Sequence, residues 1–373
     1  MPTTPRTVIA ATASYVPTRV VPNSDFLERP LLGPDGRPFA KSNREIVAQL
    51  EAITGIRERR WVEDDQVTSD IALAAARVAL ERSGIDPESL DRIIVAHNFG
   101  DVAPDNRRSD LVPSLAARVK HGLGIENPWS VAFDVAFGCP GWLQGVLLAH
   151  DAIRLGEARR ALVVGAETLS RVSDPTDRDG MIYSDGAGAT ILEARASNGS
   201  EPVGILASAT RSDARDHARL LWMGESHDRE RAGRELFLKM EGRKLYKYAC
   251  QVVPEVVMRA LERAGASLGE VSKILIHQAN AKMDEAIVRR VFELAGRDHV
   301  PLEEIERLVP MTISWLGNSS VATIPTLLDL LERGEIEGHA IAPGDLLVFA
   351  SVGAGMNANA MVYRVPPPAS PGR

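Results

Sequence analysis

Cys139 is the residue of this chain best placed to act as a nucleophile. It follows an apolar, strand-like run over 131–137, and a helical pattern begins directly after it, with Pro140 suited to the first helical position. The sulfur is therefore expected near a helix N-terminus, where free N–H groups and the helix dipole favour a thiolate. Since the thiolate is the reactive form in acyl transfer, this context favours covalent catalysis. The alternative is a buried structural cysteine.

His277 and Asn318 are the polar residues that fit best beside such a nucleophile. His277 ends the apolar run 274–276 and precedes a new helix, and polar side chains at the ends of buried strands often line a site. Asn318 follows Gly317, which permits a close approach of the backbone. The backbone N–H of Gly355 could face a reacting carbonyl. A core histidine, a helix cap and a simple turn are the respective alternatives.

Other kinds of site are not indicated by the sequence. Cys250 lies in the middle of a helical pattern and is interpreted as a core residue, and two cysteines in 373 residues do not form a disulfide framework. No CxxC, HExxH or clustered Asp/His spacing predicts a metal site. The glycines of SDGAGAT (184–190) do not match GxGxxG, so no dinucleotide site or other cofactor site is expected.

The composition is that of a globular protein. Hydrophobic residues make up 45% and charged residues 25%, and the net charge of -7 argues against nucleic-acid binding. No apolar run reaches the roughly 18 residues that a spanning helix needs, and the first residues lack the apolar segment of a signal peptide. We therefore expect a cytoplasmic protein with no membrane insertion.

Short, continuously apolar runs alternate with helical patterns along the chain, which predicts an α/β fold with sheets covered on both faces. Polar segments over 100–113 and 211–232 are expected to be loops, either lids or solvated surface. The predicted strands cover 93–96, 161–166, 274–276 and 346–350. The predicted helices cover 69–83, 140–155, 242–264, 281–295 and 320–333.

An internal repeat divides the chain. Residues 79–95 read ALERSGIDPESLDRIIV and residues 260–276 read ALERAGASLGEVSKILI. Each segment reads as a helix end, a glycine suited to a left-handed turn, a polar loop and a short strand. Two similar halves are therefore expected, at about 1–200 with the cysteine and 201–373 with the histidine and asparagine. A chance likeness of two helix–strand units is the alternative.

Together these segments resemble the β-ketoacyl-acyl carrier protein synthase III family of the thiolase superfamily. The resemblance extends over nearly the whole chain, and the ordered set of motifs is far more specific than any one of them. The matching stretches are TGIRER (54–59), VPS (112–114), LGI (123–125), FD…GCPGW (133–142), ALVVGAETLSR (161–171), DPTDR (174–178), DGAGA (185–189), HQAN (277–280), GNSS (317–320) and GAG (353–355).

The resemblance implies a five-layer αβαβα thiolase-like fold built from two similar halves. It implies that Cys139 becomes acylated, and that His277 and Asn318 stabilise the enolate formed when a malonyl-type thioester loses carbon dioxide. It further implies that the backbone N–H groups of Cys139 and Gly355 form the oxyanion hole for the acyl carbonyl. Coenzyme A or phosphopantetheine thioesters would be substrates, with no separate cofactor and no metal.

The resemblance also implies partners. Family enzymes are homodimers that bind an acidic acyl carrier protein through basic residues at the active-site entrance. The matching positions are Lys247, Lys282, Arg289 and Arg290. The last three fall near one face of the helix expected after Asn280, and an ordinary solvated helix face is the alternative.

Some positions depart from the family pattern. Where family members carry a tryptophan and an arginine for the adenine end of coenzyme A, this chain has Gln49 and Ile53, which favours a donor borne on a carrier protein. Val112 stands at the acyl-pocket position of a family phenylalanine that reaches across the dimer interface. Trp142 differs beside the nucleophile and is also assigned to the acyl pocket. These changes suggest a specialised enzyme.

The sequence thus predicts an acyltransferase of the 3-oxoacyl-acyl carrier protein synthase III type, in EC class 2.3.1, acting in lipid or polyketide-like biosynthesis. Its reaction would be acyl transfer to Cys139 followed by decarboxylative Claisen condensation on acyl carrier protein. One alternative is a related enzyme that uses another acceptor. Another is a non-catalytic partner subunit of a heterodimer.

Overall fold

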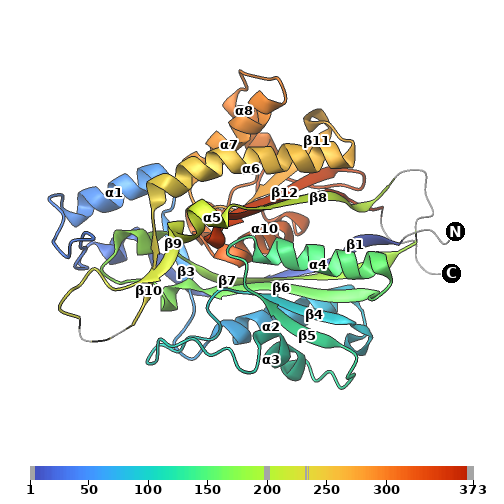
Figure 1. Cartoon of the computed structure of the whole chain (residues 1–373), viewed down its shortest axis with the longest axis horizontal. Helices are drawn as coiled ribbons and strands as arrows, with labels where there is room; N and C mark the ends of the chain where they lie inside the picture. Colours follow the sequence, from blue (N-terminus) through green and yellow to red (C-terminus); the bar gives the residue numbers. More distant parts are fainter. Residues whose placement is uncertain (1–4, 197–201, 232, 234, 368–373) are drawn as a thin grey trace.

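Two β-sheets organise the chain, and each has helices on both faces (Figure 1). The computed structural model describes residues 5–196, 202–231, 233 and 235–367. The first sheet, in the order β1-β7-β6-β4-β5, contains β1 (Arg6–Tyr15), β4 (Arg92–Ala96), β5 (Val131–Val135), β6 (Arg160–Thr168) and β7 (Asp185–Arg195). The second, in the order β11-β12-β13-β8, contains β8 (Gly204–Ser212), β11 (Val271–Ile276), β12 (Leu346–Gly353) and β13 (Asn357–Arg364).

Five layers follow one another from bottom to top in Figure 1, in the order helices, sheet, helices, sheet, helices, and three hydrophobic clusters hold them together. The helices α2 (Thr68–Ser83) and α3 (Leu115–Gly122) cover the outer face of the first sheet. Between the two sheets lie α4 (Gly141–Leu155) and α10 (Thr323–Glu332). The outer face of the second sheet is covered by α6 (Gly242–Ala264) and α7 (Ala281–Leu294). The expected five-layer αβαβα fold is confirmed.

The central strands are apolar throughout because both of their faces are buried. In β4, Ile93 and Val95 pack toward α2, whereas Ile94 and Ala96 pack toward the helices between the sheets. This alternation follows from the period of two along a strand. It explains why the runs 93–96, 161–166, 274–276 and 346–350 showed no polar side, and all four lie in strands.

The repeated segments adopt the same sequence of elements. After α2, Gly84 turns the chain in the left-handed conformation, a short 3-10 turn follows, and β4 begins. After α6, Gly265 does the same before a 3-10 turn and β11. The two segments therefore occupy corresponding places in the two sheets. The division proposed between residues 200 and 201 lies outside the described residues.

The predicted helices are present with small shifts at their ends. One difference concerns 320–333, where a 3-10 turn, η7 (Ser320–Ala322), precedes α10. Among the described residues, none of the helices has both the length and the apolar character needed to span a membrane. The remaining helical elements are η1 (Asn23–Phe26), α1 (Asn43–Thr54), η2 (Pro87–Ser89), η3 (Leu169–Arg171), η4 (Arg178–Ile182), α5 (Ala214–His217), η5 (Ala218–Leu220), η6 (Leu268–Glu270), α8 (Leu302–Leu308), α9 (Ile313–Leu316) and η8 (Ala354–Met356).

The sequence predicts a loop over 211–232, but the structure shows that part of this segment is a strand. It contains β9 (Leu221–Gly224), which pairs antiparallel with β10 (Phe237–Met240) to form a separate two-stranded hairpin. A second small sheet pairs β2 (Arg19–Pro22) with β3 (Glu58–Trp61). The apolar run from Leu220 to Met223 is short and lies among Asp and Arg residues, so the sequence pattern did not predict a strand there.

Two glycine turns, one from each sheet, meet backbone to backbone. Gly138, with φ 67°, lies between β5 and α4, and a Cβ atom there would be 2.5 Å from the nitrogen of Ala354. A Cβ at Gly353 would overlap the nitrogen of Cys139 even more closely. The missing side chains let the carboxyl end of β12 press directly against the turn that carries the cysteine.

A methyl group at Gly353 is therefore expected to force the two turns apart. We expect Gly353→Ala to lower the free energy of unfolding by about 1–3 kcal/mol, as overpacking usually does, and to slow reactions of Cys139. Denaturant titration measures the first effect. Gly269→Ala is the matched control, because the nearest atom to its new methyl lies 3.9 Å away. Equal stability of the two variants would contradict the described contact.

Candidate active site

Cys139, His277 and Asn318 line one cavity between the two sheets. Cys139 lies in the turn between β5 and α4, His277 directly follows β11, and Asn318 lies between α9 and η7. Because β4, β5 and β6 are mutually parallel and β11 is parallel to β12, the carboxyl ends of these strands meet on this side of the molecule. The structure thus brings together three residues that the sequence places far apart.

The thiol of Cys139 is held in its protonated form at rest. The residue is partly buried and lines the cavity. Burial raises the pKa of the Cys139 thiol to about 11, the Ser320 hydroxyl lowers it in part, and the charge of Glu167 raises it further. The helix end contributes about 0.3–2 kcal/mol in the opposite direction. The thiolate expected from sequence is therefore not the resting form, and Pro140 is the N-cap residue rather than the first helical residue.

His277 is a neutral imidazole in this cavity. Its backbone N–H donates to the carbonyl of Ala350 at 2.9 Å, which extends the pairing of β11 with β12 by one residue. The residue is 3% exposed, and burial lowers the pKa of its imidazole to about 4. Its Nδ1 has no hydrogen-bond partner among the residues that the structure describes. A neutral ring with a free nitrogen can exchange a hydrogen bond with a substrate without carrying charge.

Asn318 is fixed by its own backbone. Its N–H donates to the carbonyl of Ile182 at 2.9 Å, and its carbonyl accepts from the N–H of Ser184 at 2.8 Å. Gly317, with φ 64°, allows this approach, since a Cβ there would be 2.9 Å from the Cβ of Arg59. The side-chain Oδ1 accepts from the N–H of Ser320 at 2.9 Å. The amide nitrogen is thereby left as the donor toward the cavity.

The other residues of the HQAN motif hold the neighbouring backbone in place. Gln278 is fully buried, and its Oε1 accepts from the N–H groups of Thr312 and Ile313 at 2.9 and 3.0 Å. Asn280 caps α7 by accepting from the N–H of Met283 at 3.1 Å. Of this motif, His277 and Ala279 line the cavity, and Gln278 and Asn280 position the backbone around them.

The hairpin of β9 and β10 forms the apolar wall of the cavity. These wall residues were missed from sequence, although the two short apolar runs over 220–223 and 236–238 are typical of a hairpin. Further apolar side chains come from the turns after β4 and β6. The apolar lining includes Phe99, Leu169, Ile182, Leu221, Trp222, Met223, Leu238 and Met240.

Neither of the two residues assigned to the acyl pocket lines this cavity. Trp142 is 1% exposed and packs between the sheets, with its ring centroid 6.2 Å from that of Phe349. Its bulk therefore belongs to the central core, where α4 faces the second sheet. Val112 is 86% exposed and does not line the cavity of its own chain. Its assignment to the pocket of a partner subunit stays a prediction.

The glycine turn after β12 contributes backbone to the cavity. Gly353 and Ala354 line it together with Gly138. Gly355, with φ 78°, follows directly but is not among the lining residues. The role predicted for its N–H as an oxyanion donor stays a prediction, as does that of the Cys139 N–H.

A second cavity adjoins the first and opens beside α1, α6 and α7. The two share Met240 and Met283 among their lining residues. Gln49 and Ile53 from α1 line the outer cavity, together with Lys247 from α6. The positions where this chain departs from the family's coenzyme A pattern therefore lie at the approach to Cys139.

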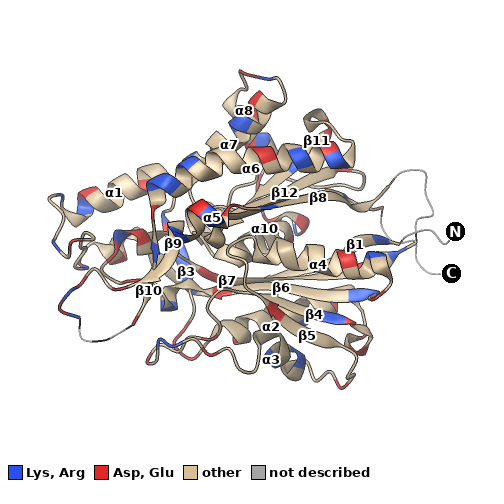
Figure 2. Ribbon diagram, in the orientation of Figure 1, with Lys and Arg blue, Asp and Glu red and all other residues tan. Residues whose placement is uncertain are grey.

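The four predicted docking residues are not equivalent. Arg289 pairs with Glu285 at 2.7 Å and donates to a backbone carbonyl, and Arg290 pairs with Glu293 at 2.6 Å. Lys247 and Lys282 are exposed and have no ion pair within the described ranges. Figure 2 shows further basic residues along the first turns of α6. The two lysines are thus the charges most available to an acidic partner.

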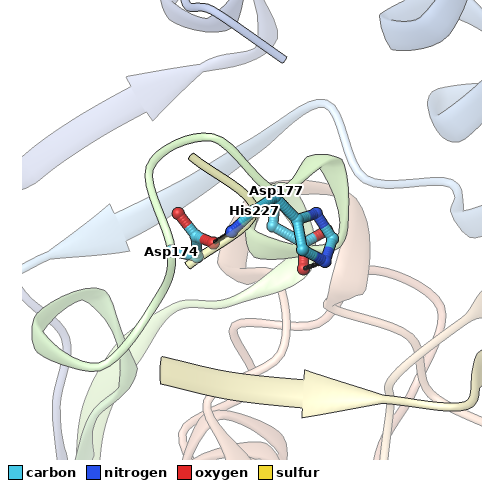
Figure 3. Close-up of side chains that lie close together, drawn as sticks. All are labelled: Asp174, Asp177 and His227. Carbon is cyan, nitrogen blue, oxygen red and sulfur yellow. Dashed lines mark hydrogen bonds and ion pairs between the residues drawn. The ribbon is translucent and has the colours of Figure 1, made fainter. Parts of the chain in front are cut away.

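A buried ionic cluster fastens the hairpin wall. Asp174, Asp177 and His227 lie close enough together to suggest a metal site (Figure 3). However, the Nζ of Lys239, on β10, lies 2.6 Å from Asp174 and 2.9 Å from Asp177. Burial alone would raise the pKa of Asp174, but the hydrogen bonds from Lys239 and neighbouring groups hold it well below its usual range. The lysine supplies the positive charge, so we do not propose a metal here.

Comparison with known proteins agrees with this geometry. The family profile described as 3-Oxoacyl-[acyl-carrier-protein (ACP)] synthase III matches residues 133–214, and its C-terminal counterpart matches 261–365. The chain is 35% identical over 361 residues to the β-ketoacyl-[acyl-carrier-protein] synthase III of Cereibacter sphaeroides, which covers 96% of this chain and 99% of the relative.

The chain belongs to the 3-oxoacyl-[acyl-carrier-protein] synthase III family. Solved structures agree with this assignment. The synthase III of Pseudomonas aeruginosa PAO1 is 27% identical with a TM-score of 0.78, covering 98% of this chain and 100% of that one. The priming β-ketosynthase of the R1128 polyketide pathway is 26% identical with a TM-score of 0.78, covering 99% of both chains. The predicted family is confirmed, and the chain is a condensing enzyme of the synthase III type.

Because burial raises its pKa, the thiol of Cys139 is expected to react slowly at neutral pH. Only the thiolate reacts, so the rate of alkylation by iodoacetamide should rise about tenfold per pH unit from pH 7 toward pH 10. Mass spectrometry of the Cys139 peptide follows the reaction. A rate that is already independent of pH at pH 7 would show that the resting form is a thiolate.

Removing the ammonium of Lys239 should loosen the hairpin wall. Lys239→Met leaves Asp174 and Asp177 buried without a cation and is expected to cost about 3–5 kcal/mol of stability. Arg215→Met is the control, since Arg215 pairs with Asp216 on the surface and should change stability little. Unfolding titrations compare them. An unchanged stability of Lys239→Met would contradict the proposed fastening.

Proposed function

We propose that this enzyme transfers an acyl group to Cys139 and then condenses it with a malonyl-type thioester on an acyl carrier protein. The observation that carries the proposal is the meeting of Cys139, His277 and Asn318 around one cavity with an apolar wall. The family membership supports the same reaction class. We assign the enzyme to the acyltransferases, EC class 2.3.1.

In the first step the sulfur of Cys139 attacks the carbonyl carbon of an acyl thioester. The bond from that carbon to the carrier's sulfur breaks, and the carrier leaves as a thiol with the proton that Cys139 loses. The buried, protonated thiol supports this proton balance, because the proton is available at the site of attack. Backbone N–H groups of Cys139 and Gly355 are proposed to hold the carbonyl oxygen as it becomes negative.

In the second step the malonyl-type thioester loses carbon dioxide. The electron pair of the broken carbon–carbon bond moves to the α-carbon and is shared with the thioester oxygen as an enolate. Donors must be waiting for this oxygen if the loss is to be fast. The amide nitrogen of Asn318 and the neutral ring of His277 line the cavity and can donate to it. Both are far weaker acids than an imidazolium, so they transfer a proton to the carbanion less readily than a charged histidine would.

In the third step the α-carbon attacks the acyl carbonyl on Cys139, and the bond to sulfur breaks. The product is a β-ketoacyl thioester on the carrier, and the sulfur of Cys139 leaves as a thiolate that regains a proton. The apolar wall from β9 and β10 supports an acyl chain as the group bound beside Cys139. The chemistry uses no metal and no cofactor beyond the thioester carriers.

The approach to the cavity supports a carrier-protein donor as well as a carrier-protein acceptor. Gln49 and Ile53 occupy the outer cavity in place of side chains that would hold an adenine. Lys247 lines the same cavity, and Lys282 is exposed in the first turn of α7, where Asn280 and Met283 on either side of it in sequence line the cavity. We further propose a cytoplasmic homodimer that acts in fatty-acid or polyketide-like biosynthesis.

Covalent acylation tests the role of Cys139. Incubation with a panel of acyl thioesters, on coenzyme A and on carrier protein, should add one acyl mass to the intact protein. Cys139→Ala should accumulate none, whereas Cys250→Ser should acylate as the parent does. Acyl label that persists on Cys139→Ala would show that another residue is the nucleophile.

Separate assays distinguish the second step from the first. His277→Ala and Asn318→Ala should still acylate at Cys139, but their decarboxylation of a malonyl carrier should fall on the order of 10²–10³-fold, as when an oxyanion donor is lost. Carbon dioxide release from labelled malonyl carrier is the measurement. Unchanged release by both variants would contradict their proposed role.

Charge at the entrance predicts the strength of docking. Lys247→Gln and Lys282→Gln should raise KM for carrier-protein substrates with little change in kcat, and added salt should reduce the difference. Arg290→Gln should have a smaller effect, because Arg290 already pairs with Glu293. Steady-state kinetics at two ionic strengths tests this order. An equal KM for the parent and both lysine variants would exclude this face as the docking surface.

A further inference from the structure

We propose that Ser320 is an additional catalytic residue, whose hydroxyl donates a hydrogen bond to the sulfur of Cys139 and so stabilises the attacking thiolate, with Asn98 and Glu167 as its positioning residues. This inference rests on the proposed role of Cys139 as the nucleophile. None of these three residues was singled out for such a role from the sequence.

The contact with the nucleophile is direct. The Oγ of Ser320 lies 3.4 Å from the Sγ of Cys139, within the range for a hydrogen bond to sulfur, although 181 residues separate the two along the chain. Both residues line the same cavity. The contact crosses from the segment before α10 to the turn before α4, which pack together between the sheets.

The direction of this hydrogen bond is set by Asn98. The Nδ2 of Asn98 lies 3.3 Å from the Oγ of Ser320 and 2.6 Å from the Oε2 of Glu167. An amide nitrogen can only donate, and its two hydrogens suffice for these two contacts. The Ser320 oxygen therefore accepts from Asn98, which leaves its single proton for the sulfur.

Glu167 holds Asn98 at the end of the hydrogen-bond chain that is farthest from Cys139. It lies on β6 with no exposed surface, and it accepts from the backbone N–H of Asn98 at 3.1 Å as well as from the side chain. Two bonds from one residue to one carboxylate fix the rotamer of Asn98. The carboxylate itself does not touch Cys139, so its influence on the sulfur passes through Asn98 and Ser320.

Ser320 also holds Asn318, the proposed enolate donor. Its backbone N–H donates to the Oδ1 of Asn318, and its φ of 53° is a left-handed conformation that a non-glycine residue adopts only at a cost. This strained backbone lets one residue present its N–H to Asn318 and its hydroxyl to Cys139. A conformation kept at such a cost next to two reacting groups supports a functional role.

The groups around Cys139 explain why a hydrogen bond from the Ser320 hydroxyl matters for the pKa of the thiol. Among the described residues, the neighbours of the thiol are the carboxyl of Glu167 on β6, whose pKa burial raises to about 7, the neutral ring of His277 after β11 and the phenol of Tyr183 after η4, and none of these is a cation. Burial and Glu167 both raise the pKa of the Cys139 thiol, whereas the Ser320 hydroxyl lowers it. Among the described residues, the Ser320 hydroxyl is thus the side-chain group at hydrogen-bond distance that favours the thiolate.

The test is the pH profile of Cys139 alkylation by iodoacetamide, in a Cys250→Ser background. Ser320→Ala should slow alkylation about tenfold or more at pH 7–9, as expected for a lost hydrogen bond to a charged group, and shift the profile to higher pH. Asn98→Ala should shift it in the same direction by less, and adding it to Ser320→Ala should change nothing further.

Ser319→Ala is the matched control, because its hydroxyl contacts Thr323 rather than the cysteine. It should keep the parent profile. If Ser320→Ala does not fold, as judged by thermal unfolding, Asn98→Ala decides the question alone. Parental profiles for the folded Ser320→Ala and Asn98→Ala variants would overturn the proposal. Alkylation needs no acyl donor, so a failure of acylation in the parent would refute the proposed function separately.

Discussion

The contact between two glycine turns is the constraint on which the rest of the site depends. Gly138 and Gly353 lack the side chains that would hold the turn after β5 away from the turn after β12, and the two backbones touch beside Cys139. This contact joins the first sheet, which carries the cysteine, to the second, which carries His277. Parallel strands alone would bring Cys139 and His277 to the same side of the molecule. The contact between the two glycine turns is what brings the two sheets close together there.

Burial follows from this contact and determines the chemistry. Packing of the two sheets buries His277 and Cys139, which lowers the pKa of the imidazole and raises the pKa of the thiol. A neutral imidazole suits an enolate better than a charged one, because it can donate without delivering a proton to the carbanion. The same burial makes each remaining hydrogen bond to the sulfur more effective, which is why the position of Ser320 matters.

Local patterns in the sequence predicted the framework well. Gly84 and Gly265 end their helices as the repeat indicated, and the apolar runs lie in buried strands. The cavity also contains the three residues that the sequence indicated, because each follows a strand or a glycine that is recognisable in the sequence.

Two features depend on contacts between distant segments and could not be predicted from local patterns. The protonation of Cys139 depends on packing, and its contact with Ser320 spans both halves of the chain. The wall residues were missed because charged neighbours mask the short runs in β9 and β10, and Trp142 was misplaced because proximity in sequence to the nucleophile does not give the direction of its side chain.

The most direct test of the account is a crystal structure of the protein after incubation with an acyl thioester. We expect electron density continuous with the Sγ of Cys139, an acyl chain along the wall formed by β9 and β10, and His277 and Asn318 facing the space beside the acyl carbonyl. An unmodified Cys139 in protein that carries the acyl mass, or a chain bound outside this cavity, would contradict it.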